Sequence, residues 1–108
     1  MEYINRIEIQ GKVGGGLLIN KSGDHMFAII PVVTFETINQ DGALIMQSTW
    51  HKVEAISSND IPKVIFESIK EGVTINVKGK LKMKRYETGD GISYMLPSII
   101  ASKIEIIK

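Results

Sequence analysis

The sequence contains no cysteine and only two histidines among its 108 residues. The chain therefore forms no disulfide and offers no thiolate ligand to a metal, and nothing in its composition points to an oxidising compartment. No acidic pair and no serine-centred motif stands out. We expect no enzymatic activity, no bound metal and no cofactor, because nucleophilic, acid-base and metal-assisted chemistry would find almost no suitable residues.

Long hydrophobic runs and a strong net charge are also missing. The longest apolar run, Met26 to Val33, is far shorter than the roughly 20 residues of a membrane-spanning helix. The N-terminus lacks the basic start and apolar core of a signal peptide. These features predict a soluble, cytoplasmic protein that does not associate with membranes. The formal net charge is only +1, so affinity for a polyanion would have to come from local clustering of charge.

The hydrophobic residues, 44% of the chain, suffice for one compact domain spanning residues 1–108, which is too short for two ordinary domains. Alternation of apolar and polar residues dominates and indicates β-strands. The second strand is apolar at both parities, so both its faces should be buried for part of its length. Pro31 within it predicts a bulge or an unpaired strand side. We expect strands at residues 7–13, about 25–38, 44–56, 73–86 and about 94–107.

One helix is expected between the third and fourth strands. A residue among Ser58 to Asp60 is placed to cap its start, and Pro62 lies in its first turn. Ile61, Ile65 and Ile69 repeat every four residues along one face. Five strands joined by long β-hairpin loops, with one short helix in this position, predict an all-β fold, the five-stranded OB-fold Greek-key barrel.

A row of lysines in the fourth expected strand is the most informative local feature. Lys78, Lys80, Lys82 and Lys84 occupy every second position, and Tyr86 follows on the same period. In a strand these side chains share one face. The other face is expected to carry Val77, Gly79, Leu81 and Met83. A basic row that ends in an aromatic residue favours single-stranded nucleic acid, since phosphates attract cations and unstacked bases stack on aromatic rings. Lysines also protect sheet edges from pairing with other chains, which requires no ligand.

Trp50 shares its parity with Lys52 and Glu54, whereas His51 has the apolar parity of its strand. Trp50 is therefore expected on a ligand-facing surface rather than in the core. His51 is expected to be half-buried and hydrogen-bonded. We predict an electrostatic groove with Trp50 and Tyr86 as platforms under successive bases. Its basic residues are Lys52, Lys80, Lys82, Lys84 and Arg85.

Several segments resemble bacterial single-stranded DNA-binding protein, in the same order and over essentially the whole chain. They are Asn5 to Gly14 (NRIEIQGKVG), Thr49 to Val53 (TWHKV) and Gly72 to Tyr86 (GVTINVKGKLKMKRY), followed by Asp90 and Gly91. The resemblance implies binding of single-stranded DNA without sequence specificity in DNA replication, recombination or repair. It also implies a homo-oligomer, with a homotetramer favoured over a dimer.

The resemblance places Trp50 and Tyr86 where the family has base-stacking aromatic residues. Ile56 takes the place of a base-stacking phenylalanine, and no tryptophan stands near Glu36. The candidate nucleic-acid contacts are Trp50, Lys52, Ile56, Lys80, Lys82, Lys84, Arg85 and Tyr86, and the further candidates are Phe35, His51, Tyr94 and Arg6.

The chain departs from the family at its end, because no acidic C-terminal tip for recruiting replication proteins follows the last strand. Recruitment through such a tip is therefore not expected. Two alternatives stay open. One is an OB-fold adaptor like primosomal replication protein N, a dimer that binds single strands and partner proteins. The other is a structural OB-fold subunit whose lysines only protect an edge.

Overall fold

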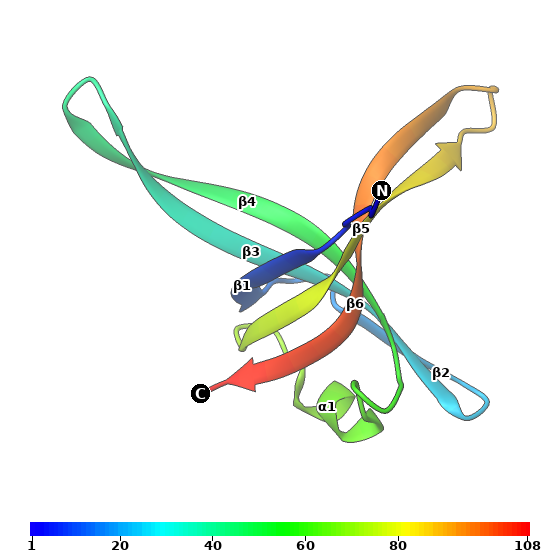
Figure 1. Ribbon diagram of the computed structural model, residues 1–108. Coiled ribbons are helices and arrows are strands. Elements are labelled where there is room, and N and C mark those ends of the chain that lie inside the picture. Colours follow the sequence, from blue (N-terminus) through cyan, green and yellow to red (C-terminus); the bar gives the residue numbers. More distant parts are fainter.

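The computed structural model describes residues 1–108 as six strands and one short helix (Figure 1). The strands are β1 (Ile7–Val13), β2 (Leu18–Ser22), β3 (His25–Gln40), β4 (Ala43–Ile56), β5 (Thr74–Glu87) and β6 (Ser93–Ile107). The helix α1 (Lys63–Ser68) lies between β4 and β5. No helix has the length and apolar character that crossing a membrane requires.

Five of the strands form a closed ring in the order β1, β5, β6, β4, β3. Neighbours in the ring pair antiparallel except β4 and β6, which run parallel. The ring closes where Lys12 and Val13 of β1 pair with β3. A closed barrel of five strands, with a short helix between β4 and β5, is the predicted OB-fold.

The core of the barrel comes from alternate residues of each strand, as the period-two pattern predicts. Buried strand residues include Val13, Ala28, Ile30, Val32, Val53, Ala55, Ile75, Val77, Ile99 and Ile104. Ile61, Phe66 and Ile69 from the helical segment pack into the same cluster. On β3 the inward face is buried, whereas on the outward face Phe27, Ile29 and Pro31 stay half-buried. Val33 is the buried residue of the outward face, so both faces are buried only near it.

The helix is shorter than the sequence pattern suggests, and its predicted cap is wrong. Pro62 occupies the N-cap position in extended backbone, and no side chain caps the helix. The Ser58 hydroxyl instead accepts a hydrogen bond from the Ile61 amide at 3.2 Å, which closes a turn before the helix. Proline disfavours helical backbone in the residue before it, so Ile61 stays outside the helix.

Pro31 lies where β3 changes partners. On one edge of β3, pairing with β2 ends at Ile29 and pairing with β1 begins at Val32. The Pro31 carbonyl accepts a hydrogen bond from the Gly14 amide at 2.8 Å on this edge. The backbone N–H that proline lacks would point to this same edge, so its absence does not affect the other edge. Pairing with β4 therefore continues through Lys52 without a bulge. The predicted bulge is absent, and the predicted unpaired side corresponds to a gap between the β2 and β1 ladders at Ile30 and Pro31. The partner strand β2 is not among the predicted elements.

Hairpins extend from the barrel in different directions (Figure 1). We call residues 35–48 of β3 and β4 the β3–β4 arm, and residues 83–97 of β5 and β6 the β5–β6 arm. The β3–β4 arm ends in a two-residue turn at Asp41 and Gly42, whose φ angles of 53° and 83° suit the twist of a hairpin. The radius of gyration is 16.0 Å, whereas a compact domain of this length has about 13 Å. The arms account for this excess.

Candidate nucleic-acid interface

The outward side chains of β3, β4, β6 and β5 form one continuous surface, which we call the outer face. Residues paired directly across two strands point to the same side of the sheet. Trp50 pairs with Val33, Lys52 with Pro31, and Tyr86 with Tyr94. The predicted site residues on the outer face are Phe35, Trp50, Lys52, Ile56, Lys80, Lys82, Lys84, Tyr86 and Tyr94.

Trp50 is exposed on the outer face, as its parity predicts. Its side chain is 61% accessible to solvent. The ring rests against Gly14, because a Cβ atom added at Gly14 would lie 2.3 Å from Cζ3 of Trp50. With Ile29, Pro31 and neighbouring residues of β4 it borders a hollow of about 250 Å³. Glycine at position 14 therefore leaves the space in which the indole lies.

A second aromatic platform lies at the start of the β5–β6 arm. The rings of Tyr86 and Tyr94 stack with their centroids 5.8 Å apart and an interplanar angle of 22°. Lys52 reaches across from β4, and its Nζ donates a hydrogen bond to the Tyr86 hydroxyl at 2.6 Å. This bond raises the pKa of Lys52 above its ordinary value, so the amine stays charged beside the rings. Aromatic surface and positive charge therefore meet at one place.

A buried carboxylate follows Lys52 on the same face of β4. Glu54 is 8% exposed, and its two oxygens accept hydrogen bonds from Lys84 Nζ at 2.6 Å and from Ser98 Oγ at 2.5 Å. Burial alone would raise the pKa of Glu54, but these hydrogen bonds outweigh burial and lower it. The carboxylate therefore stays ionised and joins β4 to the base of the β5–β6 arm.

Fewer free cations lie on the outer face than the sequence predicts for the groove. Lys84 lies on the outer face, but its charge is neutralised by Glu54. Arg85 lies on the opposite face of β5, where it pairs with Met95 and has Glu87 at 3.7 Å. Lys80 and Lys82 have no carboxylate within 4.0 Å. Among the predicted groove residues, the cations that lie on the outer face and remain free of carboxylates are thus Lys52, Lys80 and Lys82.

The remaining candidates lie at different depths. His51 is half-buried, and its Nε2 lies 2.9 Å from the Thr34 hydroxyl, as predicted; burial lowers its pKa. Phe35 and Ile56 are each 57% exposed on the outer face. Arg6 belongs to the segment before β1. No three histidine, aspartate or glutamate side chains come together in a way that could hold a metal ion.

A comparison with solved structures agrees with this architecture. No protein-family model and no curated protein matches the chain. Among solved structures, the chain is similar to a Plasmodium falciparum SSB in complex with ssDNA. The two are 22% identical with a TM-score of 0.84, and the match covers 100% of this chain and 98% of that one. At this identity the similarity establishes a shared OB-fold.

Proposed function

We propose that the protein binds single-stranded DNA without sequence specificity on its outer face. The observation that carries the proposal is the convergence of aromatic rings and unpaired cations on one surface. Trp50 and the Tyr86–Tyr94 pair supply the rings, and Lys80 and Lys82 supply the cations. The similar Plasmodium falciparum SSB structure, which contains ssDNA, supports the same ligand class.

Two energetic contributions follow from this arrangement. Each base stacked on an aromatic side chain contributes about 1–3 kcal/mol to the binding free energy, whichever base it is. Each phosphate neutralised by a lysine adds roughly 0.7 to the slope of log affinity against log salt concentration for a single strand. Lys52, Lys80 and Lys82 together would therefore give a slope of about 2. Neither contribution needs a titrating or nucleophilic group, so the proposed function is non-catalytic.

Edge protection does not explain Lys78 and Lys80. β5 pairs with β1 on one side and β6 on the other from Thr74 to Gly79. At Leu81 the Asn5 side chain bonds both the backbone amide and the carbonyl of the strand, at 2.9 and 2.7 Å. Lys80 thus lies where β5 has no open edge, so it has nothing to protect.

We propose that this activity serves DNA replication, recombination or repair in the cytoplasm. We further propose that the protein acts as a homo-oligomer, a tetramer in preference to a dimer.

The second candidate is an adaptor like primosomal replication protein N. The exposed apolar side chains at the arms, such as Leu44, Met46 and Met95, favour it by offering surface to a partner protein. A measurement of molecular mass in solution separates the tetramer from a dimeric adaptor.

A fluorescence titration of Trp50, the only tryptophan, tests the proposed ligand. Oligo-dT and duplex DNA of equal length are each added at low and moderate salt. We expect quenching by the single strand only, and weaker binding as the salt concentration rises. An absence of both quenching and oligonucleotide retention would refute the proposal and favour an adaptor or a structural subunit.

A further inference from the structure

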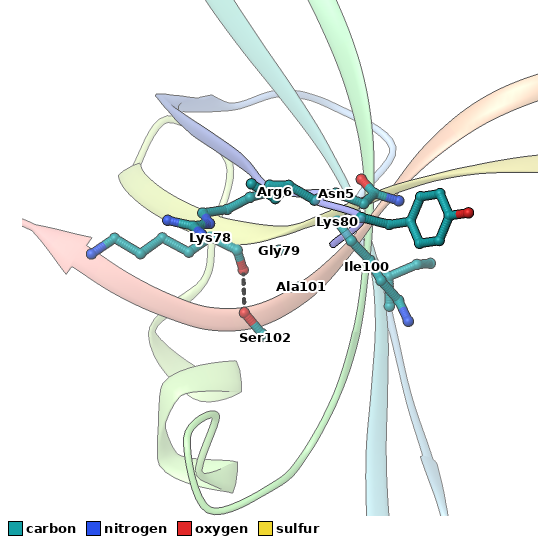
Figure 2. A pocket seen from close by; sticks show the side chains of 10 residues that line it. Asn5, Arg6, Lys78, Gly79, Lys80, Ile100, Ala101 and Ser102 are labelled. Atoms are coloured by element: carbon teal, nitrogen blue, oxygen red, sulfur yellow. Dashed lines mark hydrogen bonds between the residues drawn. The ribbon is translucent and has the colours of Figure 1, made fainter. Parts of the chain in front are cut away.

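A basic hollow lies beside the outer face, where the segment before β1 crosses β5 and β6 (Figure 2). Its volume is about 660 Å³, within the range of about 300–1,000 Å³ that is usual for ligand pockets. Three short stretches line it, namely Tyr3 to Arg6, Lys78 to Lys80 and Ile100 to Ser102. Lys80 also belongs to the outer face, so the two surfaces are contiguous.

The hollow is built by backbone features of all three stretches. The pairing of β5 with β6 shifts register between Lys78 and Gly79, which leaves Ser102 as an extra residue in β6. At Gly79 the strands approach so closely that an added Cβ atom would lie 2.1 Å from the Ile100 carbonyl oxygen. The Asn5 bonds to Leu81 fix the N-terminal segment over this place. The position of Arg6 is therefore determined by the fold.

The net charge around the hollow is positive, although Glu8 of β1 pairs across the strands with Lys78. Arg6, Lys78 and Lys80 line it, no acidic residue does, and none of the three has a carboxylate within 4.0 Å. Lys78 also pairs across the strands with Lys103, whose amine forms an ion pair with Glu105 at 3.3 Å. Figure 2 shows the Arg6 and Lys78 side chains extending in the same direction. Like charges held together repel one another, and a bound polyanion relieves that repulsion.

We propose that this hollow binds backbone phosphates of the same DNA strand whose bases stack on the outer face. The inference rests on the proposed function and extends it to a second, purely electrostatic subsite. Alternate residues of a strand are about 7 Å apart, so Lys82, Lys80 and Lys78 form a stepped row of cations. Arg6 continues this row beyond the aromatic platforms.

The geometry favours a phosphodiester chain over a small free anion. A small anion needs several donors that converge on one point. Here the Ser102 hydroxyl donates to the Lys78 carbonyl at 3.0 Å, and the Asn5 amide donates to Leu81. The remaining side-chain donors are the Tyr3 hydroxyl and cations spread over a hollow of about 660 Å³. A linear polyanion can meet each of them in turn.

The test compares the double variant Arg6→Gln, Lys78→Gln with wild type in Trp50 quenching titrations with a long oligo-dT at several salt concentrations. Both replaced side chains are exposed, so the fold should be unaffected. The control, Lys21→Gln with Lys63→Gln, removes the same charge from β2 and α1. We expect the salt slope to fall by about 1.4 in the double variant, two phosphates at roughly 0.7 each. Maximal Trp50 quenching and the slope of the control should not change.

The outcomes separate the two proposals. If wild-type protein shows no quenching by oligo-dT, the proposed function fails and this subsite with it. If wild type binds but the double variant keeps the wild-type slope, or only matches the control, the subsite alone is refuted. Amide chemical shifts of Gly79 and Ser102 distinguish the source of the phosphate. Saturable shifts with inorganic phosphate at constant ionic strength, without shifts on adding oligo-dT, would overturn the proposal in favour of a free-anion site.

Discussion

The substitution Glu54→Gln should weaken the fold and strengthen the response of DNA binding to salt. It keeps the shape of the side chain and removes the charge that holds Lys84 and receives the Ser98 hydrogen bond. A hydrogen bond to a charged group contributes about 1.5–3 kcal/mol. The Lys84 side chain is 34% exposed, so water recovers part of this loss. We therefore expect a loss of about 1–2 kcal/mol, which lowers Tm by roughly 5–15 °C.

The pH dependence gives this prediction a sign that can be checked. The pKa of Glu54 is lowered in the folded protein. Its ionised form therefore stabilises the fold above the unfolded-state pKa of about 4.3, and this contribution is lost as the pH falls through the folded-state pKa. The difference in Tm between wild type and Glu54→Gln should be present at pH 7 and shrink below about pH 4.

DNA binding should depend more strongly on salt in Glu54→Gln, because Lys84 becomes available to a phosphate. The salt slope measured by Trp50 quenching should rise by roughly 0.7. The control is Glu87→Gln, which removes an exposed carboxylate 3.7 Å from Arg85 on the other face of β5. That variant should change stability by no more than about 0.5 kcal/mol. An unchanged Tm at pH 7 with an unchanged salt slope for Glu54→Gln would refute the role given to the buried pair.

Further substitutions separate stacking, charge and position. Trp50→Ala should weaken oligo-dT binding by about 1–3 kcal/mol without changing the salt slope, whereas Lys82→Ala should lower that slope by roughly 0.7. The anisotropy of a labelled oligonucleotide measures both effects. Identical behaviour of the two variants would contradict the separate roles of stacking and charge. Gly14→Ala places a Cβ atom 2.3 Å from the Trp50 ring, so the emission spectrum of Trp50 and the affinity should change while Tm hardly does. Tyr86→Phe removes the hydroxyl that accepts a hydrogen bond from Lys52, but it should keep the stacking contribution of about 1–3 kcal/mol that Tyr86→Ala loses. The same anisotropy assay compares the two variants.

Alternation of side chains accounts for most of what the sequence predicted correctly. The positions of the barrel strands along the chain and the exposed face of Trp50 follow from period-two patterns, because each barrel strand has one buried side. The same alternation puts Arg85 on the face of β5 opposite Lys84, so the prediction that Arg85 lines the groove is wrong. The strand β2 was not predicted, because Leu18–Ser22 has only five residues and none of them is buried, so no alternating pattern marks it.

Long-range contacts account for most of what the sequence did not predict. Glu54 shares the parity of Trp50, but only the fold shows that it neutralises Lys84, thirty residues further along the chain. The same holds for Asn5, whose hydrogen bonds to Leu81 join residues separated by 76 positions. Leu81 and Met83 lie opposite the lysines as predicted, yet they are 43% and 48% exposed because β5 leaves the barrel there. No local pattern encodes the point at which a strand leaves a barrel.

The two arms give the molecule uneven resistance to local opening. Each arm is a ribbon of two strands, without the third strand or buried core that an isolated hairpin needs for stability in water. Backbone amides in the arms should therefore exchange with solvent deuterium through local opening, whereas amides around Ile30 and Val53 in the barrel should exchange only on wider unfolding. A ligand that lies across the arms has to order them as it binds, and this ordering reduces its net affinity. Binding should consequently slow exchange most where exchange in the free protein is fastest.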